Sequence, residues 1–458
     1  MAGAGERIAE TMSGADALLW TIGRDPVLRP TVIAVLALDR APGWAEVRAR
    51  MAMLTEIVPR LRSHAVSRPP GRGRPQFVDD IHFDLDIHLR RIGLPSQATF
   101  RAVLDIAQVM GTTGFDPELP PWEAVVVEGV DGERAALIVK LHHALVDGVG
   151  GLAMLLHLLD RRRRAPSPRP PVAKAPPGRT SLDFLEHLPT PRQVLEAARQ
   201  VAANPAVQID HLLSTGASVA RLLAPARRPI SALMTERSSR RSFEAFELTP
   251  GALRQAATVT GGTVNDVFVA SVVCGLGRYH EFHGSALGGL RALMPVNVRG
   301  DDDGVAGNHF VPARFVIPML ADPAACLREV QRITGSWKHA PGLALSDVMA
   351  TGLNLLPAPL VTAMWGSMLK GDDFCVTNVP GAPFETYLAG SRVDHFYAFA
   401  PPSGAALNVS LVTPAGRACI GVNVDTAAVP DSAKLATCLE EGFDEISRLG
   451  PTRPEKSR

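Results

Sequence analysis

The stretch from Leu137 to Gly151, "LIVKLHHALVDGVGG", joins an apolar run to a glycine-containing turn and then to a leucine-rich segment. Branched apolar residues dominate the run, which favours a buried β-strand. Two adjacent histidines, His142 and His143, end it, and Asp147 and Gly148 follow at a fixed distance. Three interpretations are open at this point: a metal site, a catalytic base, or two packed residues at the end of a strand.

Strand geometry separates these interpretations. Neighbouring residues in a strand point to opposite faces, so His142 and His143 cannot easily share one ion. No HExxH or Cys/His spacing accompanies them, and we expect no bound metal. The same geometry lets one histidine be held in the interior while the other projects into a cleft. There a neutral imidazole can take a proton from an alcohol or thiol near pH 7.

The residues after the histidines suit the same catalytic interpretation. Asp147 would cap the turn, hold a neighbouring cation or fix the orientation of a ring, and Gly148 allows a sharp turn before the helix-like "GLAMLLHLLD". The sequence contains no G-x-S-x-G elbow, so a serine nucleophile is not indicated. The sequence therefore predicts direct transfer from an activated acyl donor. Histidines at strand ends are usually packed and hydrogen-bonded. The full H-H-x-x-x-D-G string, however, rarely occurs by chance, which favours a functional motif.

Composition and linker-like segments indicate two α+β halves. The chain has 458 residues, which is long for one core, and its net charge of +1 gives no general attraction for nucleic acid. Prolines and arginines fill residues 160–180, which is typical of an extended linker. The predicted division is a disordered start (1–11), an N-terminal half (12–160), a linker with a helical connection (161–240), a C-terminal half (241–450) and a tail (451–458).

Each half is expected to be a mixed sheet with packed helices. The hydrophobic periodicity predicts helices over 43–63 and 98–110 in the first half. The alternating and apolar runs predict strands over 30–39, 122–130 and 135–143, the last two forming a hairpin across "DGER". In the second half a strand-like run from Arg241, a helix after "GGTVND" and later runs at 290–299, 308–319, 372–381, 405–414 and 417–425 follow the same plan.

Two segments bear on location. Charged residues within the first ten positions argue against a secretion signal. Residues 348–369 carry no charge, but Pro357 and Pro359 interrupt them, so two short buried or interfacial helices joined at "LPAP" are expected instead of a membrane span. We expect a cytoplasmic protein that associates peripherally with the inner face of the plasma membrane or with lipid droplets.

Motifs spread along most of the chain resemble one family. "HHALVDG" is similar to the HHxxxDG motif of coenzyme A-dependent acyltransferases and peptide-synthetase condensation domains. The wider pattern resembles the bacterial wax ester synthase/diacylglycerol acyltransferase family, from Met12 to about Leu449. The stretches that carry the resemblance, in order, are "MSGADALLW", "FDLDIHLRRIGLP", "PPWE", "TVNDVFVASVVCGLGRYH", "MPVNVR", "TNVPG" and "LNVSLVTPAG".

The resemblance implies a fold of two chloramphenicol-acetyltransferase-like halves with a channel between them. It also implies an O-acyltransferase that makes triacylglycerol or wax ester from long-chain acyl-CoA, a co-substrate, and a lipid alcohol. No bound cofactor is expected. His143 would be the general base, with His142 and Asp147 supporting it and Gly148 required by the backbone. The alternatives are another acceptor, such as a glycolipid, polyketide alcohol or amine, and a non-catalytic lipid-binding protein of this fold.

Further positions matched by the family motifs have a structural and a functional interpretation each. Asn265 and Asp266 begin a helix, where they could cap it, line the channel or both. The remaining positions could contact substrate but are also explained by packing, pairing or turn formation: Trp122, Asn297, Arg299, Thr377 and Asn378. Pro121 replaces the leucine usual in the "PLW" motif, and Pro117 stands where the family usually has an arginine. These departures bear on acceptor preference more than on reaction type.

Overall fold

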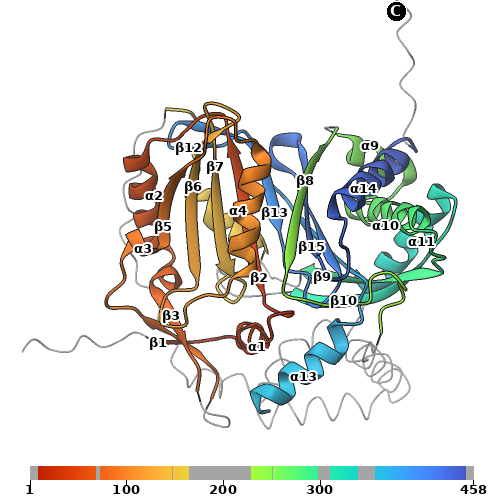
Figure 1. Ribbon diagram of the computed structural model, residues 1–458, viewed down its shortest axis with the longest axis horizontal. Coiled ribbons are helices and arrows are strands. Elements are labelled where there is room, and N and C mark those ends of the chain that lie inside the picture. Colours follow the sequence, from red (N-terminus) through yellow and green to blue (C-terminus); the bar gives the residue numbers. More distant parts are fainter. Residues whose placement is uncertain are drawn as a thin grey trace, which may run out of the picture.

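The computed structural model describes residues 9–68, 73–146, 148–164, 228–249, 251–297, 310–338 and 356–449. Two six-stranded sheets lie side by side, one in each half of the molecule (Figure 1). A third, three-stranded sheet has the order β1-β4-β3, formed by Ala9–Thr11, Gln76–Asp79 and Ser63–Val66. Residues 9–11 form strand β1, which corrects the prediction of a disordered segment over 1–11 for these three residues. The predicted tail, 451–458, lies outside the described residues.

The N-terminal sheet has the order β12-β13-β2-β7-β6-β5. Its strands are Tyr387–Leu388, Ser391–Phe399, Thr31–Leu38, Arg134–His142, Trp122–Val130 and Leu89–Gly93. All neighbours are antiparallel except β5 and β6. The predicted hairpin is confirmed, because β6 and β7 pair across a turn where Asp131 and Gly132 both have positive φ angles of 46° and 98°. Positive φ at both residues suits the right-handed twist of a hairpin.

The alternation of β7 buries both faces of this sheet. Leu137 and Leu141 pack in a cluster with α2 (Trp44–Ile57) and α5 (Gly148–Leu156). Ala136 and Ile138 point the other way, into a cluster with α4 (Phe100–Thr112). A strand that is apolar on both faces is fixed in register, because a slip by one residue would exchange the two faces. The end of β7 is therefore held firmly in place.

The C-terminal sheet has the order β10-β9-β11-β14-β15-β8. Its strands are Phe310–Pro318, Gly289–Asn297, Phe374–Val379, Leu407–Val412, Ala418–Asp425 and Arg241–Leu248. β11 is parallel to both of its neighbours, whereas the other pairs are antiparallel. The largest core cluster joins this sheet to four helices: α9 (Ala252–Thr260), α10 (Val264–Phe282), α11 (Pro323–Lys338) and α14 (Ser432–Ser447).

Strands β12 and β13 correct the predicted division of the chain. They lie within residues 241–450, assigned to the C-terminal half, yet they complete the N-terminal sheet beside β2 (Figure 1). β13 also contacts β14 and β15 of the other sheet. Gly421 of β15 lies at this crossing, where a Cβ atom would overlap the carbonyl oxygen of Ala398. The two halves are thus connected by shared structure as well as by the linker.

The predicted linker is described only at its two ends. Asp160 forms an isolated bridge with Tyr387, and Arg163 donates to Asp39 at 2.5 Å and to the carbonyl of Gly390 at 3.1 Å. These contacts fasten the first residues of the linker to the N-terminal sheet. Residues 165–227, which include most of the proline-rich stretch, lie outside the described residues.

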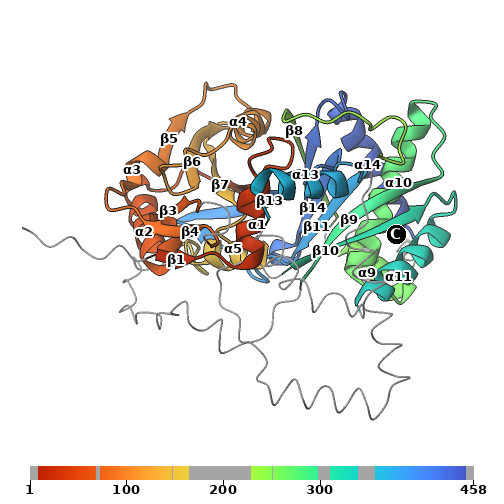
Figure 2. The same cartoon turned by 90° about the horizontal axis from the view of Figure 1, so that it is seen from below.

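Helix α13 (Ala358–Leu369) occupies the uncharged segment, and it begins directly after Pro357. It packs against α1 (Gly14–Ile22) at the edge of the molecule, as Figures 1 and 2 both show. The predicted helix before Pro357 lies outside the described residues. In the described chain, no single helix is long and apolar enough to span a membrane; α9 and α10 pass that test only together, and they meet at a bend of 104°. The remaining short elements are η1 (Pro59–Arg62), α3 (Leu85–His88) and η3 (Pro414–Gly416).

Candidate active site

His142 is the last residue of β7, and its side chain is packed inside the protein. Its main-chain N–H donates to the carbonyl of Pro121 at 3.0 Å, and Thr31 lies opposite it in the sheet. The imidazole is 5% exposed and lies against the rings of Trp20 and Phe115, at centroid distances of 4.8 and 5.9 Å. His142 is therefore an interior residue that joins the end of the strand to helix α1.

The surroundings of His142 keep its ring neutral. Its Nδ1 accepts the main-chain N–H of Ala144 at 3.1 Å, which places the ring proton on Nε2. Burial lowers the pKa of His142 to about 3, and repulsion by Arg29 and by His143, when that ring is protonated, acts in the same direction. A group with so low a pKa is a weak proton acceptor near pH 7. His142 can orient the turn but is poorly suited to be the base.

His143 follows directly, where the chain leaves the strand. Its main-chain N–H donates to the carbonyl of Pro30 at 2.9 Å, which ties the turn to the start of β2. Its side chain is half-buried, in contrast to the buried His142. Helix α5 begins at Gly148, and it contacts β11 of the C-terminal sheet. Asp147 lies outside the described residues, so its predicted supporting role stays a prediction.

Arg60 is a buried cation that was not among the predicted site residues. Its Nη1 donates to the carbonyl of Leu145 and to Asp16, both at 3.3 Å, while its other nitrogens hold Glu10 at 2.6 and 3.0 Å. The Leu145 carbonyl belongs to the turn between His143 and α5. Arg60 thus connects this turn to acidic residues at the N-terminus. The acidic pair in "AETMSGAD" was the available sequence signal, but a partner 44 residues away in the chain leaves no local pattern.

Trp122 lies in the core at the start of β6. Its indole N–H donates to the carbonyl of Leu61 at 2.7 Å, and its side chain is 2% exposed. The ring stacks on His88 at 4.8 Å, and His88 stacks in turn on Phe83 at 5.3 Å. His88 Nδ1 also bonds the Trp122 carbonyl at 2.8 Å. These contacts explain why two of the family-like stretches, "FDLDIH" and "PPWE", are adjacent in space.

The asparagine and aspartate at the start of α10 have different contacts. The N-cap is Thr263, and Asp266 completes a capping box with it while also accepting the hydroxyl of Thr334 at 2.6 Å. Asn265 instead reaches toward the neighbouring strands: its Oδ1 accepts from Asn378 at 3.5 Å, and its Nδ2 contacts the sulfur of Met294 at 3.3 Å. Asp266 therefore has a structural position, whereas Asn265 joins a polar group beside β9 and β11.

Strand β11 brings two further predicted residues into that polar group. Thr377 accepts the Nδ2 of Asn408 at 3.2 Å, and Asn378 is exposed beside Asn265. Because β11 contacts α5, this group lies on the side of the C-terminal sheet that approaches the histidine turn. Asn297 is the last residue of β9, with a side chain that is not described, and Arg299 lies outside the described residues. Their substrate-binding roles stay predictions.

A cavity of about 690 Å³ lies between the loop after α1 and helix α13. Arg24, Asp25 and Lys370 line its polar side, and Ala363 and other small residues of α13 line the rest. Lys370 Nζ bonds Asp25 at 2.5 Å. Gly23, next to Arg24, lies so close to His142 that a Cβ atom there would approach Nε2 at 3.3 Å. The cavity therefore begins one residue away from a contact of His142. Among the described residues, no group of three His, Cys, Asp or Glu side chains is placed to hold a metal ion.

Comparison with solved structures defines the fold class. The wax ester synthase/diacylglycerol acyltransferase of Marinobacter aquaeolei VT8 superposes with a TM-score of 0.61 at 20% identity, covering 96% of this chain and 99% of that one. The first condensation domain of the calcium-dependent antibiotic synthetase gives 0.61 at 15% identity, covering 96% and 97%. The starter condensation domain of rhizomide synthetase, solved with C8-CoA, gives 0.56 at 14% identity, covering 96% and 94%. The molecule has the two-domain fold of the coenzyme A-dependent acyltransferases and condensation domains.

Sequence comparison defines the family within that class. The chain matches the wax ester synthase/diacylglycerol acyltransferase catalytic domain over residues 12–268 and the corresponding C-terminal domain over 306–447. A Mycobacterium tuberculosis protein named as a diacylglycerol O-acyltransferase is 32% identical, covering 98% of this chain and 94% of its own length. Another from the same organism is 28% identical, covering 88% and 90%. The chain belongs to the wax ester synthase/diacylglycerol acyltransferase family, and it is an acyltransferase.

Proposed function

We propose that His143 is the general base of a direct transfer from long-chain acyl-CoA to a lipid hydroxyl. The base takes the hydroxyl proton as the oxygen attacks the thioester carbonyl carbon. The new C–O ester bond forms, the C–S bond breaks, and the thiolate of coenzyme A leaves and recovers the proton from His143. The observation that carries this proposal is the difference between the two histidines: packing keeps His142 neutral, while His143 is half-buried at the turn into α5.

Several observations support diacylglycerol, with long-chain alcohols, as the acceptor. Both Mycobacterium tuberculosis relatives described above are named as diacylglycerol O-acyltransferases. A related fold holds an acyl-CoA, in the rhizomide synthetase domain. The cavity beside α13 has a wall of small and mainly apolar side chains, which suits an alkyl chain, and Arg24 at its edge, which suits a phosphate. Triacylglycerol and wax ester are then the products.

The same helix supports a location at a lipid surface. Leu360 and Met364 are 47% and 38% exposed and lie one turn apart on α13, and Leu356, 37% exposed, lies just before the helix begins. Apolar side chains in such a row favour contact with a membrane or droplet. We propose a cytoplasmic enzyme that works on the inner face of the plasma membrane or on lipid droplets, close to its apolar substrates.

The test of the base is the variant His143→Ala. Its release of free coenzyme A in the presence of added alcohol should fall by roughly a hundred- to ten-thousandfold. His157→Ala is the matched control, because His157 is an exposed histidine in the segment that follows α5 and should leave the rate unchanged. Equal thermal midpoints for both variants would show that the fold is retained. A His143→Ala enzyme with wild-type turnover would refute the proposed mechanism.

The acceptor is tested by competition. Wild-type enzyme is incubated with palmitoyl-CoA and equal amounts of diacylglycerol and hexadecanol, and the products are separated by chromatography. We expect both triacylglycerol and wax ester, with triacylglycerol in excess. If neither forms while a glycolipid or amine is acylated, the acceptor assignment is wrong although the reaction type stands.

A further inference from the structure

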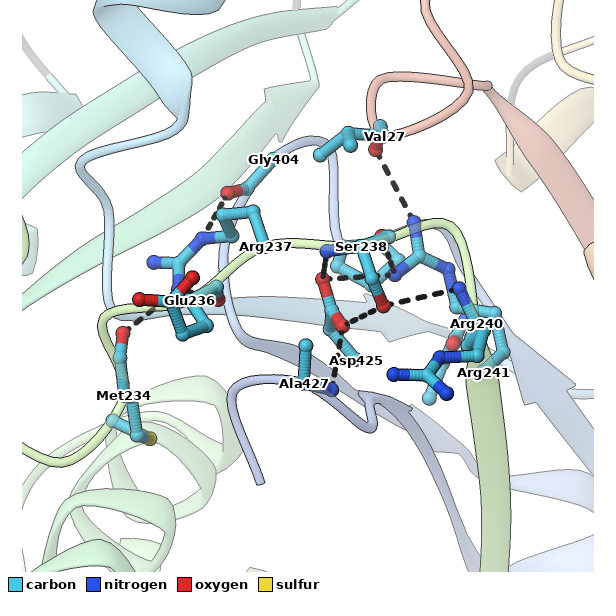
Figure 3. A network of polar contacts seen from close by, with 12 residues as sticks. Val27, Met234, Glu236, Arg237, Ser238, Arg240, Arg241, Gly404, Asp425 and Ala427 are labelled. Atoms are coloured by element: carbon cyan, nitrogen blue, oxygen red, sulfur yellow. Dashed lines mark hydrogen bonds and ion pairs between the residues drawn. The ribbon is translucent and has the colours of Figure 1, made fainter. Parts of the chain in front are cut away.

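A small polar cavity lies on the boundary between the two halves, behind the end of β7. The N-terminal half contributes Arg29, Thr31 and Thr112, and the C-terminal half contributes Arg241 and Asn423. Arg241 donates across the boundary to the carbonyl of Val27 at 3.2 Å, and Asp425 lies 3.5 Å from its guanidinium (Figure 3). Proline residues on both sides close the cavity. None of the predicted catalytic or substrate-binding residues lines it.

Two polar atoms of the lining have no hydrogen-bond partner in the protein: Thr31 Oγ1 and Asn423 Oδ1. Both side chains are deeply buried, at 6% and 4% exposure. A buried polar atom without a partner costs about 1–3 kcal/mol, so two that line one cavity indicate that something else bonds them. The amide of Asn423 cannot be reversed without loss, because its Nδ2 already donates to the carbonyl of Ala400 at 2.9 Å.

The chemistry of the lining selects the ligand. The free Asn423 Oδ1 is an acceptor and requires a donor, which excludes a simple anion. Arg29 and Arg241, which both line the cavity, repel a cation. A neutral group that both donates and accepts satisfies all of these contacts. The room for the centre of a water molecule is about 10 Å³, close to the roughly 10–15 Å³ that a single internal water occupies.

We propose that this cavity is a binding site for one ordered water molecule, bonded to Thr31 Oγ1 and Asn423 Oδ1, that joins the two halves behind the histidine turn. Thr31 is the residue paired with His142 in the sheet, and Asn423 holds the end of β13 through Ala400. The water therefore connects the strand pair that positions the turn to the point where β13 crosses the C-terminal sheet. This inference does not depend on the acyl-transfer proposal, since it concerns binding of water to the folded chain.

Removal of the Thr31 hydroxyl tests the site, because the direction of the change in the thermal midpoint differs between a bonded and an unbonded hydroxyl. If Thr31 bonds a water, Thr31→Val should lower the thermal midpoint by roughly 1–2 °C, the scale expected for one lost internal hydrogen bond in a chain of this size. Ser391→Ala is the matched control. The Ser391 hydroxyl is also buried without a partner, at 1% exposure, but it does not line this cavity. Its removal should leave the midpoint unchanged or raise it.

A high-resolution crystal structure of the full chain provides the direct observation. We expect a water peak within hydrogen-bond distance of both Thr31 and Asn423 in the wild type, and its loss in Thr31→Val. A chloride titration at constant ionic strength separates water from an anion, because an anion site would give a saturable rise in the midpoint that Arg29→Gln removes. A midpoint raised by Thr31→Val, a missing peak, or a saturable chloride effect would each overturn the proposal.

Discussion

The two sheets have the same number of strands but are completed differently. The C-terminal sheet is built only from strands that follow the linker: β8 to β11, β14 and β15. The N-terminal sheet needs β12 and β13, which come from beyond the linker. β13 lies beside β2, and β2 pairs with β7, whose end carries the histidines. The sheet that holds the candidate base thus depends on the other half for its edge, so the two halves are expected to fold together.

A substitution where β13 crosses β15 tests whether the N-terminal sheet depends on the other half. Gly421→Val would force a side chain into the carbonyl of Ala398, and main chain on both sides cannot move aside cheaply. We expect a loss of more than about 3 kcal/mol in the free energy of unfolding, or failure to fold. Urea unfolding followed by circular dichroism measures it. Gly335→Ala in α11, where a Cβ atom meets nothing within 4 Å, is the control and should be neutral or stabilising. A Gly421→Val protein as stable as the wild type would contradict the crossing.

Each half also has a buried arginine bonded to a fully buried aspartate, but only one of them touches the histidine turn. Arg60 holds Asp16 and the Leu145 carbonyl, whereas Arg314 holds Asp372 in the C-terminal half. Replacement by lysine should cost stability in both, roughly 1–3 kcal/mol, because lysine cannot reproduce the forked contacts. Arg60→Lys should in addition lower kcat about tenfold with little change in KM, since the turn loses its support. Equal kcat values for Arg60→Lys and Arg314→Lys would show that Arg60 supports the fold only.

The strands around the histidines could be predicted because their signals are local. β2, β6 and β7 are apolar runs bounded by turn residues, and the structure confirms them within a residue or two of the predicted limits. The separation of His142 from His143 also follows from a local rule, the alternation along a strand. The sequence could not predict which of the two histidines is packed. That depends on Trp20 of α1 and Phe115 after α4, which are distant in the chain and contact His142 only in the folded protein.

The position of β13 was missed for a related reason. Its sequence, Ser391–Phe399, was not among the predicted strands, and its place in the N-terminal sheet is decided by tertiary pairing with β2. Nothing in the order of the elements indicates that a strand from the second half returns to the first. Arg60 was not predicted for the same reason: the sequence alone does not distinguish a buried, ion-paired arginine from an exposed one.

The neutral state of His142 can be measured as a dependence of stability on pH. Its pKa is about 3 in the folded protein and about 6.5 when unfolded, so the unfolded chain binds the proton first as the pH falls. Stability contributed by His142 is complete above pH 6.5 and is lost between there and pH 3, by at most about 1.4 kcal/mol for each pH unit. His142→Asn retains an acceptor for the Ala144 N–H but does not titrate. The stability of the wild type should therefore fall more steeply than that of the variant between pH 7 and 5; parallel curves would show that burial is less complete.

The smallest effect is expected at Asn378, on the C-terminal side of the site. This side chain is exposed, and its bond to Asn265 is long, at 3.5 Å, so Asn378→Ala should change the stability by less than about 0.5 kcal/mol. If it bonds a substrate, kcat/KM should fall about fivefold, the equivalent of one hydrogen bond of about 1 kcal/mol. Asn265→Ala separates the two roles. If the role of Asn378 is only its hydrogen bond with Asn265, both variants should lose the same small factor in kcat/KM. If Asn378 contacts the substrate directly, the loss in kcat/KM should be larger for Asn378→Ala. An unchanged kcat/KM would leave strand pairing in β11 and the contact with Asn265 as the whole role of Asn378.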